Sequence, residues 1–311
     1  MLPVANTNLS GQRSDFGQNL TQPLLGLYDT FADRIASIKI IDLAAFLTAY
    51  ALFVISHMPI DLALAVLIVA LTCVSKFRNH CLFWFAIVSV WLPRMIYNFH
   101  LYEDHCFFMM YWCLAFGLAL LGKRRKFALR RSARLLIGTC FAIGFVWKVV
   151  SSEFIDGSLF HFKLLFDYRF SEMVTGPVGG LSAASTASNL EAYLTLRSVD
   201  QPANFVPLDF PNRVSSLAWL MTVWTVAIEG LIAIMFLLPS SRIAERWRDL
   251  VLIFFMLSTY IVVPVLGFAS AFVALGVAQA RSSRVKLGYL LSSIFLLVWF
   301  SIRWKLLALF P

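Results

Sequence analysis

Long apolar runs dominate this sequence and restrict what it can fold into. Runs of about 15–22 residues recur along most of the chain, and a helix needs about 20 apolar residues to cross the hydrocarbon core of a bilayer. We therefore predict an all-α integral membrane protein, a polytopic helical bundle with about nine spans. The candidate spans are residues 40–57, 60–75, 81–97, 106–122, 135–150, 216–238, 249–263, 265–280 and 287–302.

The composition agrees with lipid rather than water as the solvent. The 311 residues are 60% hydrophobic and 14% charged, whereas soluble domains carry about 25% charged residues. The net charge of +9 would suggest nucleic acid in a soluble protein, but in a membrane protein it follows from basic loops on the cytoplasmic side. We expect membrane lipid and a lipophilic small molecule as partners, and no nucleic acid.

Basic residues sort to one side of the predicted spans. They cluster before the first span, at 76–78, at 123–134, at 240–249 and at 281–286. All five sites are cytoplasmic if the N-terminus is cytoplasmic. Only Arg303 and Lys305, after the last span, depart from this rule. We expect a polar cytoplasmic segment at 1–35, then one transmembrane domain at 36–311, in the inner membrane of a bacterium.

The longest stretch between predicted spans is residues 151–214, which this topology places outside. Its beginning, 154–170, is aromatic and amphipathic, which predicts an interfacial helix. Its middle is rich in Gly, Ser and Ala, which predicts a mobile or partly ordered loop. The 249–280 pair is separated only by a Pro/Gly turn, so eight spans with a re-entrant hairpin is an alternative count.

Lys148 is the most informative charged residue, because it follows an apolar run near the outer end of its span. A snorkelling lysine would extend its ammonium to the interface. A desolvated lysine would instead favour its neutral form, which is a base or nucleophile near pH 7. Gly144 lies on the same helical face and leaves room for a flat ring, while Trp147 would wall that pocket or anchor at the interface.

Three other ionisable groups lie at membrane depth and are candidates for function. His105 begins a span and is either an interfacial histidine bonded to its acidic neighbours or a proton donor and acceptor. Arg94 is expected to pair with Glu103 or Asp104. Glu229 is either protonated or paired with a lysine or arginine of another helix. No P-loop, GxGxxG, HExxH or GxSxG motif occurs, and no metal is expected.

Four stretches, in order, resemble one known family. They are YEDHCFFMMYWCLAFGL, AIGFVWKVVSSEFIDGS, WTVAIEGLIAIMFLLP and IFFMLSTYIVVPVLGFASAFVALG. The first resembles an Asn-His entry into an apolar helix, with Asp104 in place of the asparagine, and the second a lysine stretch followed by an aromatic residue and an acidic-Gly step. The family is the horizontally transferred transmembrane (HTTM) domain, the membrane part of vitamin K-dependent gamma-carboxylases.

The resemblance implies roles for the charged residues. In the carboxylase a neutral lysine deprotonates reduced vitamin K, whose oxygenation yields the base that attacks glutamate. Lys148 resembles that lysine, and His105 resembles the histidine that assists it. The hypothesis is a redox-linked enzyme that uses a reduced quinone at Lys148, His105, Gly144 and Trp147. The alternative is a non-catalytic membrane protein that scaffolds or transports a lipophilic molecule.

Overall fold

A computed structural model describes residues 15–56, 58–175, 178–198, 211–238 and 242–309, and every regular element in these ranges is a helix. The helices are α1 (Asp15–Ser37), α2 (Ile40–Val54), α3 (Pro59–Cys73), α4 (Ser75–Arg78), α5 (Cys81–Tyr97), η1 (Phe99–Leu101), α6 (Asp104–Leu121), α7 (Arg125–Val150), α8 (Ser152–Ile155), α9 (Ser158–Phe166), η2 (Tyr168–Phe170), α10 (Ser171–Thr175), α11 (Ala183–Ser198), α12 (Asn212–Leu237), α13 (Arg242–Tyr260), α14 (Leu266–Gln279) and α15 (Ser283–Leu309).

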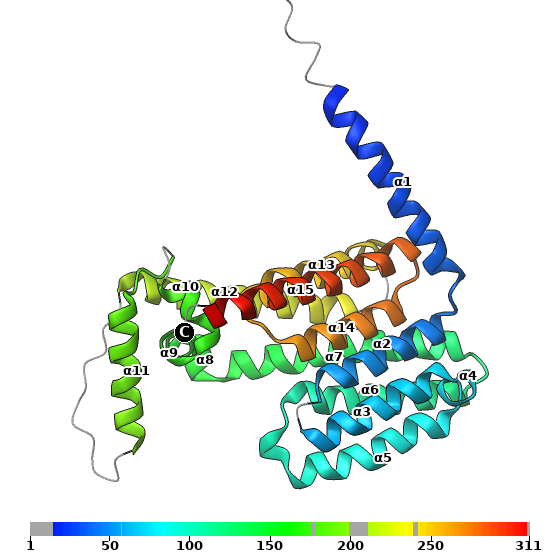
Figure 1. The fold of residues 1–311 in the computed structure, drawn as a ribbon, viewed down its shortest axis with the longest axis horizontal. Helices are drawn as coiled ribbons and strands as arrows, with labels where there is room; N and C mark the ends of the chain where they lie inside the picture. The colour runs from blue at the N-terminus through cyan, green and yellow to red at the C-terminus, as the bar shows by residue number, and fades with distance from the viewer. Residues whose placement is uncertain (1–14, 57, 176–177, 199–210, 239–241, 310–311) are drawn as a thin grey trace, which may run out of the picture.

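The long helices run side by side along the longest axis of the molecule, while α1 extends away from one end (Figure 1). The most extensive contact between two described helices joins α7 to α12. Glycines on both helices allow this close approach: a Cβ at Gly138 would touch Leu237, and one at Gly230 would touch Phe145. Small residues commonly bring membrane helices together, because lipid provides no hydrophobic driving force between them.

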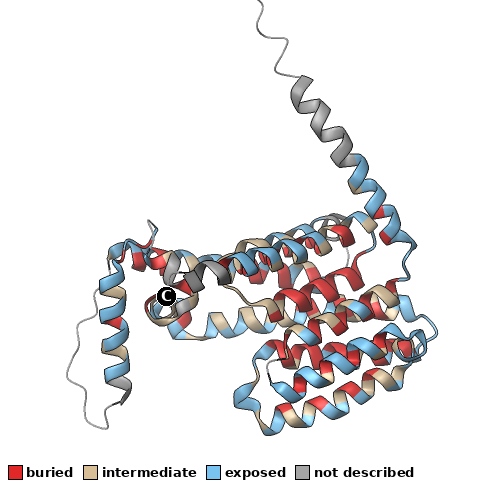
Figure 2. Cartoon of the chain, viewed as in Figure 1, coloured by how far each residue is buried: buried red, intermediate tan, exposed pale blue. Residues whose placement is uncertain are grey.

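Helix α14 lies in the middle of the bundle. It contacts α2, α6, α7, α13 and α15, and all of its residues except Leu266 and Phe268 are buried (Figure 2). Its 14 residues extend about 21 Å at 1.5 Å per residue. That length is less than the roughly 30 Å of the hydrocarbon core, so α14 is a short inner helix rather than an ordinary full span.

Each predicted span overlaps a helix, and the protein is an all-helical integral membrane protein, but a count of nine spans is not confirmed. Among the described residues, four helices are long and apolar enough, by length and composition, to cross a membrane: α6, α7, α12 and residues Ser283–Arg303 of α15. A fifth span results if Gly26–Ser37 and α2 are taken together, although the chain bends by 100° between them. The apolar helices α3, α5 and α14 are shorter.

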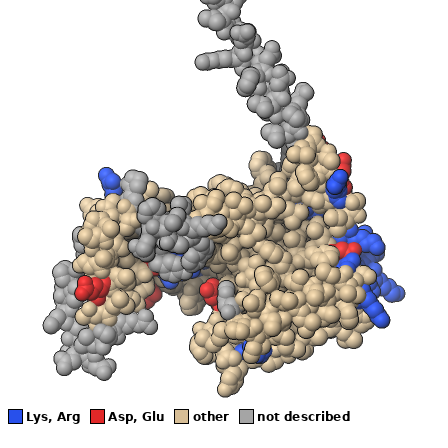
Figure 3. Space-filling view, viewed as in Figure 1, with Lys and Arg blue, Asp and Glu red and all other residues tan. Residues whose placement is uncertain are grey.

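Charge is separated along the bundle. Lys and Arg side chains gather at the end where α4 lies (Figure 3), and the helices α8 to α11 lie at the opposite end (Figure 1). The residues of the 123–134 cluster belong to this basic end, because they form the loop before α7 and its first turns. The sorting of basic loops in the sequence therefore corresponds to a real separation in space.

The segment 151–214 is more regular than its composition suggests. Helix α9 confirms the predicted helix at the beginning of the segment. The expected loop in the middle instead contains α11, which begins with a side-chain cap: the Ser185 N–H donates to Ser182 Oγ at 3.0 Å. Tyr193 of α11 then stacks on Phe166 of α9, with ring centroids 4.7 Å apart. Residues 176–177 and 199–210 lie outside the described residues.

Arg303, the exception to the charge rule, has a structural partner at the end opposite the basic cluster. Its guanidinium donates to the carbonyl oxygens of Ile261 and Val262, where α13 ends, at 3.2 and 2.9 Å. It also donates to the Arg169 carbonyl at 2.7 Å. Backbone carbonyls that leave a helix within the bundle need such donors, because lipid offers none. The Arg303 side chain therefore stabilises the α13–α14 turn by donating hydrogen bonds to its carbonyl groups.

We predict that Gly276→Ala destabilises the protein. An added Cβ would lie 2.5 Å from Tyr289 Cε1, and that ring is fully buried, with its hydroxyl donating to Asp249 Oδ1 at 2.9 Å. Overpacking of this kind costs about 1–3 kcal/mol, which thermal unfolding in detergent would measure. Gly26→Ala is the control, because nothing lies within 4 Å of its added Cβ. Equal melting temperatures for both variants would contradict the packing.

Cysteine labelling tests the predicted orientation. Ser188 on α11 and Ser282 at the basic end are both exposed, so each is replaced by cysteine in a Cys73→Ser background, which removes the exposed native thiol. We expect a membrane-impermeant maleimide added outside intact cells to label Ser188→Cys only. Labelling of Ser282→Cys would require permeabilised cells. Labelling of Ser282→Cys only, from outside intact cells, would show that the orientation is the opposite of the predicted one.

Candidate functional site

The strongest candidate site is an ion pair between α7 and α12. The Lys148 ammonium donates to Glu229 Oε2 at 2.6 Å, and the side chains are only 18% and 11% exposed, respectively. Glu229 therefore has a basic partner on another helix, as one of the two sequence-based alternatives predicted. Two charges removed from water are stabilised only when each satisfies the other closely, and a distance of 2.6 Å meets that condition.

Gly144 allows the carboxylate to reach the lysine. It lies one turn before Lys148 on α7, and a Cβ there would be 3.0 Å from Glu229 Oε2 and 3.6 Å from Lys148 Nζ. The space that the sequence offered for a flat ring beside Gly144 is thus occupied by the pair itself. A side chain at this position would push the two helices apart at the point where their charges meet, so the glycine is part of the ion-pair geometry.

A sharp turn after α7 closes the pair from one side. Gly157 has φ of 81°, a left-handed conformation that glycine adopts without strain, and it lies between α8 and α9. The turn brings Phe154 near the pair, with its ring centroid 5.4 Å from Lys148 Nζ, close enough for a cation–π contact. At the same turn, the Ser158 N–H donates to the Asp156 carboxylate at 2.8 Å and lowers the pKa of that exposed group.

These contacts distinguish the two interpretations of Lys148. A snorkelling side chain would direct its ammonium to the interface, whereas this ammonium lies between Glu229 and the Phe154 ring. Its neighbour Trp147 is 73% exposed, a position that suits an anchor at the interface better than a wall of a closed pocket. The lysine is thus an inward-facing partner in a polar pair.

His105 lies at the first turn of α6, near a different set of residues. Its Nδ1 is 3.3 Å from Glu103 Oε2, which agrees with the expected contact to an acidic neighbour. The imidazole packs edge-on against Phe268 and lies directly over Gly267, where an added Cβ would overlap it. The Lys148 ammonium is held instead by a carboxylate of α12, so the two predicted catalytic residues lie in different surroundings.

Two further polar side chains lie near Glu229. Cys140 of α7 and the fully buried Tyr260 of α13 are both within electrostatic reach of its carboxylate. Cys140 is also within reach of Asp104, the residue before His105. Sequence reasoning missed Tyr260, because an aromatic residue at the end of an apolar run normally indicates an interfacial belt.

Arg94 pairs with a different acid from the one expected. The prediction named Glu103 or Asp104, but Arg94 Nη2 lies 3.3 Å from Asp61 Oδ1 at the beginning of α3. Asp61 is almost fully buried and also accepts from the Tyr102 hydroxyl at 2.6 Å. A buried carboxylate needs a cation, whereas Glu103 is 64% exposed and solvated. Burial and then the bond to Asp61 raise the pKa of Tyr102.

No protein-family model, curated protein or solved structure matches the chain. The carboxylase-like resemblance therefore depends on the four sequence stretches alone. Among the described residues, no group of three His, Cys, Asp or Glu side chains is placed to hold a metal ion. The arrangement offers a partly buried ion pair, Lys148 and Glu229, with an aromatic ring beside it.

We predict that Glu229→Gln destabilises the protein by about 3–5 kcal/mol, the usual result of leaving one member of a buried pair without its partner. The Lys148 ammonium would then lack a counter-charge in a largely enclosed position. Thermal unfolding in detergent measures the loss, and Glu103→Gln is the matched control because that carboxylate is exposed. A further Lys148→Met substitution should recover part of the stability. An unchanged melting temperature in Glu229→Gln would exclude the ion pair.

Proposed function

We propose that this protein is a membrane-embedded enzyme whose Lys148–Glu229 pair exchanges a proton with a lipophilic substrate of the quinone type. The observation that carries the proposal is the 2.6 Å contact between the two groups. At this separation the ammonium donates directly to the carboxylate, so a proton can pass between the two groups. Moving that proton from Lys148 to Glu229 leaves a neutral amine, which is a base, without changing the net charge of the pair.

The electrostatics favour a reaction that creates an anion beside the pair. When Lys148 takes a proton from a substrate hydroxyl, the pair becomes positive by one charge and the substrate becomes negative by one charge. The two new charges attract each other strongly, because little water screens them at this depth. The Phe154 ring, 5.4 Å from Nζ, limits the access of water from its side.

A reduced quinone is the substrate class that the carboxylase-like resemblance implies, and when bound it would supply acidic ring hydroxyl groups. The residues fit such a molecule only in part: Trp147 offers an exposed ring on the adjacent side of α7, whereas the Phe154 ring beside the amine is buried. The position beside Gly144 does not fit a ring while Glu229 occupies it. We therefore assign no ring to this position, and retain Gly144 as the residue that positions Glu229.

His105 enters the proposal as a second proton-exchanging group. Its separate position, over Gly267 and against Phe268, suits a relay better than direct contact with the same hydroxyl as Lys148. Cys140 and Tyr260 lie within electrostatic reach of the Glu229 carboxylate.

The second candidate is a non-catalytic protein that scaffolds or transports a lipophilic molecule. The observation in its favour is that Glu229 fills the space beside Gly144, so that the pair already joins α7 to α12 without any ligand. In that case the pair holds two helices together, and its protonation state is irrelevant to any reaction.

Replacement of Lys148 separates the two candidates. We predict that Lys148→Arg and Lys148→Ala lose quinol oxidation equally, because a guanidinium stays protonated and cannot act as a base. The assay follows the absorbance of a reduced naphthoquinone in proteoliposomes under air. Lys163→Arg is the control, because Lys163 is a more exposed lysine that pairs with Asp167 at 3.6 Å, and it should keep full activity.

The possible results of this assay support either the enzyme or the scaffold or transport candidate, but not both. Full activity in Lys148→Arg would show that only the positive charge matters and would end the proposal of a lysine base. A wild-type protein that binds the quinone, as shown by mass spectrometry of the copurified lipid, but does not oxidise it would support the scaffold or transport candidate.

A further inference from the structure

Helix α1 carries an apolar stripe that the bundle leaves exposed. Leu27 and Phe31 are about one turn apart on this helix, and they are 54% and 50% exposed. The same spacing continues toward the beginning of α1, where the sequence places Phe16, Leu20 and Leu24. Because α1 extends away from the bundle (Figure 1), the stripe faces something other than the described helices.

The last turns of α1 are held against the beginning of α15. Ala32 and Ile35 form a small buried cluster with Leu287 of α15. Nearby, the Tyr28 hydroxyl donates to the Arg284 carbonyl at 2.8 Å. Apolar packing and a hydrogen bond between the first and last long helices therefore fix the position of α1 relative to the bundle.

These contacts indicate the depth of α1 in the membrane. The part of α15 that is long and apolar enough to cross a bilayer begins at Ser283. Leu287 lies about 6 Å along this segment, at 1.5 Å per residue, and Leu290, which packs against the same cluster, lies about 10 Å along it. Helices that bind a membrane surface are buried about 5–10 Å into the boundary between headgroups and acyl chains. Helix α1 therefore contacts α15 at the depth of a surface-bound helix.

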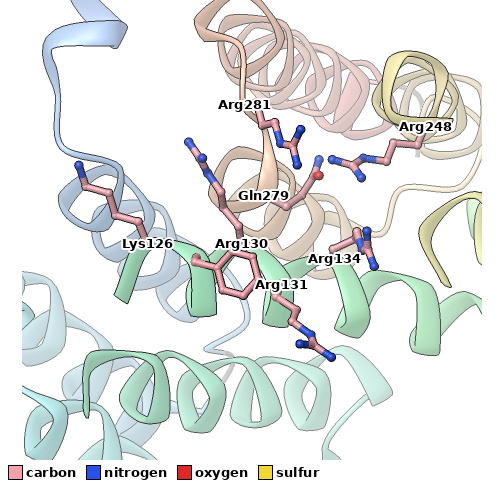
Figure 4. Close-up of a pocket in the computed structure, with 8 residues that line it drawn as sticks. Lys126, Arg130, Arg131, Arg134, Arg248, Gln279 and Arg281 are labelled. Atoms are coloured by element: carbon pink, nitrogen blue, oxygen red, sulfur yellow. The ribbon is translucent and has the colours of Figure 1, made fainter. Parts of the chain in front are cut away.

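Basic side chains mark the same depth on neighbouring helices. Lys286, next to Leu287 on α15, lies within electrostatic reach of Lys126 and Arg130 on α7. Figure 4 shows Lys126 and Arg130 together with Arg281, which comes just before α15. Basic residues beside membrane helices are attracted to the anionic headgroups of the membrane surface. The headgroups are therefore expected where α1 leaves the bundle.

The direction of α1 also agrees with a membrane surface. The chain bends by 100° between Gly26–Ser37 and α2. Helix α2 packs along α14 within the bundle, and Figure 1 shows it running with the other long helices. A helix that is nearly perpendicular to the bundle helices lies nearly parallel to the plane of the bilayer. Helix α1 therefore has one side toward the lipid and one side toward the water.

Those two sides of α1 differ in polarity. At 3.6 residues per turn, Leu27 and Phe31 lie roughly a quarter turn to one side of the face that packs on α15. Asp29 and Asp33, which are both exposed, lie roughly a quarter turn to the other side. Asp29 is paired there with Arg284 at 3.0 Å. An apolar side opposite an acidic side suits a helix that separates lipid from water.

We propose that α1 is an in-plane helix that binds the surface of the lipid bilayer, with Leu27 and Phe31 inserted between the headgroups. Arg34 is exposed and lies two turns after Leu27 on the same face, so its guanidinium can extend to a lipid phosphate. A second copy of the chain or a soluble protein would also cover an apolar stripe. Neither occupant accounts for the 100° bend or for the depth at which α1 contacts α15.

Spin labels on opposite sides of α1 test the proposal. Leu27→Cys and Phe31→Cys carry a nitroxide on the apolar side, and Asp33→Cys and Ala36→Cys are the matched controls on the other side. All four positions are exposed, so each variant should keep the melting temperature of the wild type. The full chain carries Cys73→Ser, and this protein without an added cysteine gives the background signal. The protein is reconstituted into vesicles of phosphatidylcholine and phosphatidylglycerol. Electron paramagnetic resonance then compares the access of oxygen, which concentrates in lipid, with that of a water-soluble nickel complex.

We expect the labels at positions 27 and 31 to favour oxygen and to lie at a depth of about 5–10 Å, and the labels at positions 33 and 36 to favour the nickel complex. Equal access of the nickel complex to all four labels would place α1 in water. Labels at 27 and 31 that neither reagent reaches would show a protein cover, and spin–spin broadening that disappears on dilution with unlabelled protein would identify that cover as a second copy. Each of these last results would overturn the proposal.

Discussion

The absence of water around the backbone is the constraint on which the rest of this structure depends. In hydrocarbon, each peptide N–H and C=O must find its partner within the protein, and helices achieve this locally. Every regular element in the described ranges is accordingly a helix. Where α13 ends inside the bundle, the freed carbonyls of Ile261 and Val262 are bonded by the Arg303 guanidinium. A charged side chain at depth here completes the backbone hydrogen bonding.

The same constraint explains how charges are used elsewhere. The pairs Lys148–Glu229 and Arg94–Asp61 each join two helices that are distant in sequence. In each pair, a buried charge is neutralised by contact with an opposite charge. The need for this neutralisation determines which residue becomes the partner.

Much of the fold could be predicted from the sequence. Long apolar runs indicate which segments lie in lipid, and basic loops indicate which segments lie in water. The helical class, a helix within residues 154–170 and a basic partner as one of two alternatives for Glu229 follow from these patterns. The partner of Arg94 could not be predicted, since Asp61 is far away in sequence and only the packing of α3 against its neighbours brings it close. Helix α11 was also missed, because a composition of small residues does not reveal the Ser182 cap or the stacking of Tyr193 on Phe166.

The buried position of α14 has a consequence for biogenesis. The helix is too short to cross the bilayer alone, and its surroundings include α2, near the beginning of the chain, and α15, at its end. Its final environment is therefore enclosed only after the ribosome has synthesised α15. Until then α14 has no full set of protein neighbours, and the insertion machinery or lipid must shelter it. A chain stalled before α15 would leave the centre of the bundle open, so the environment of α14 is completed well after α14 itself has been synthesised.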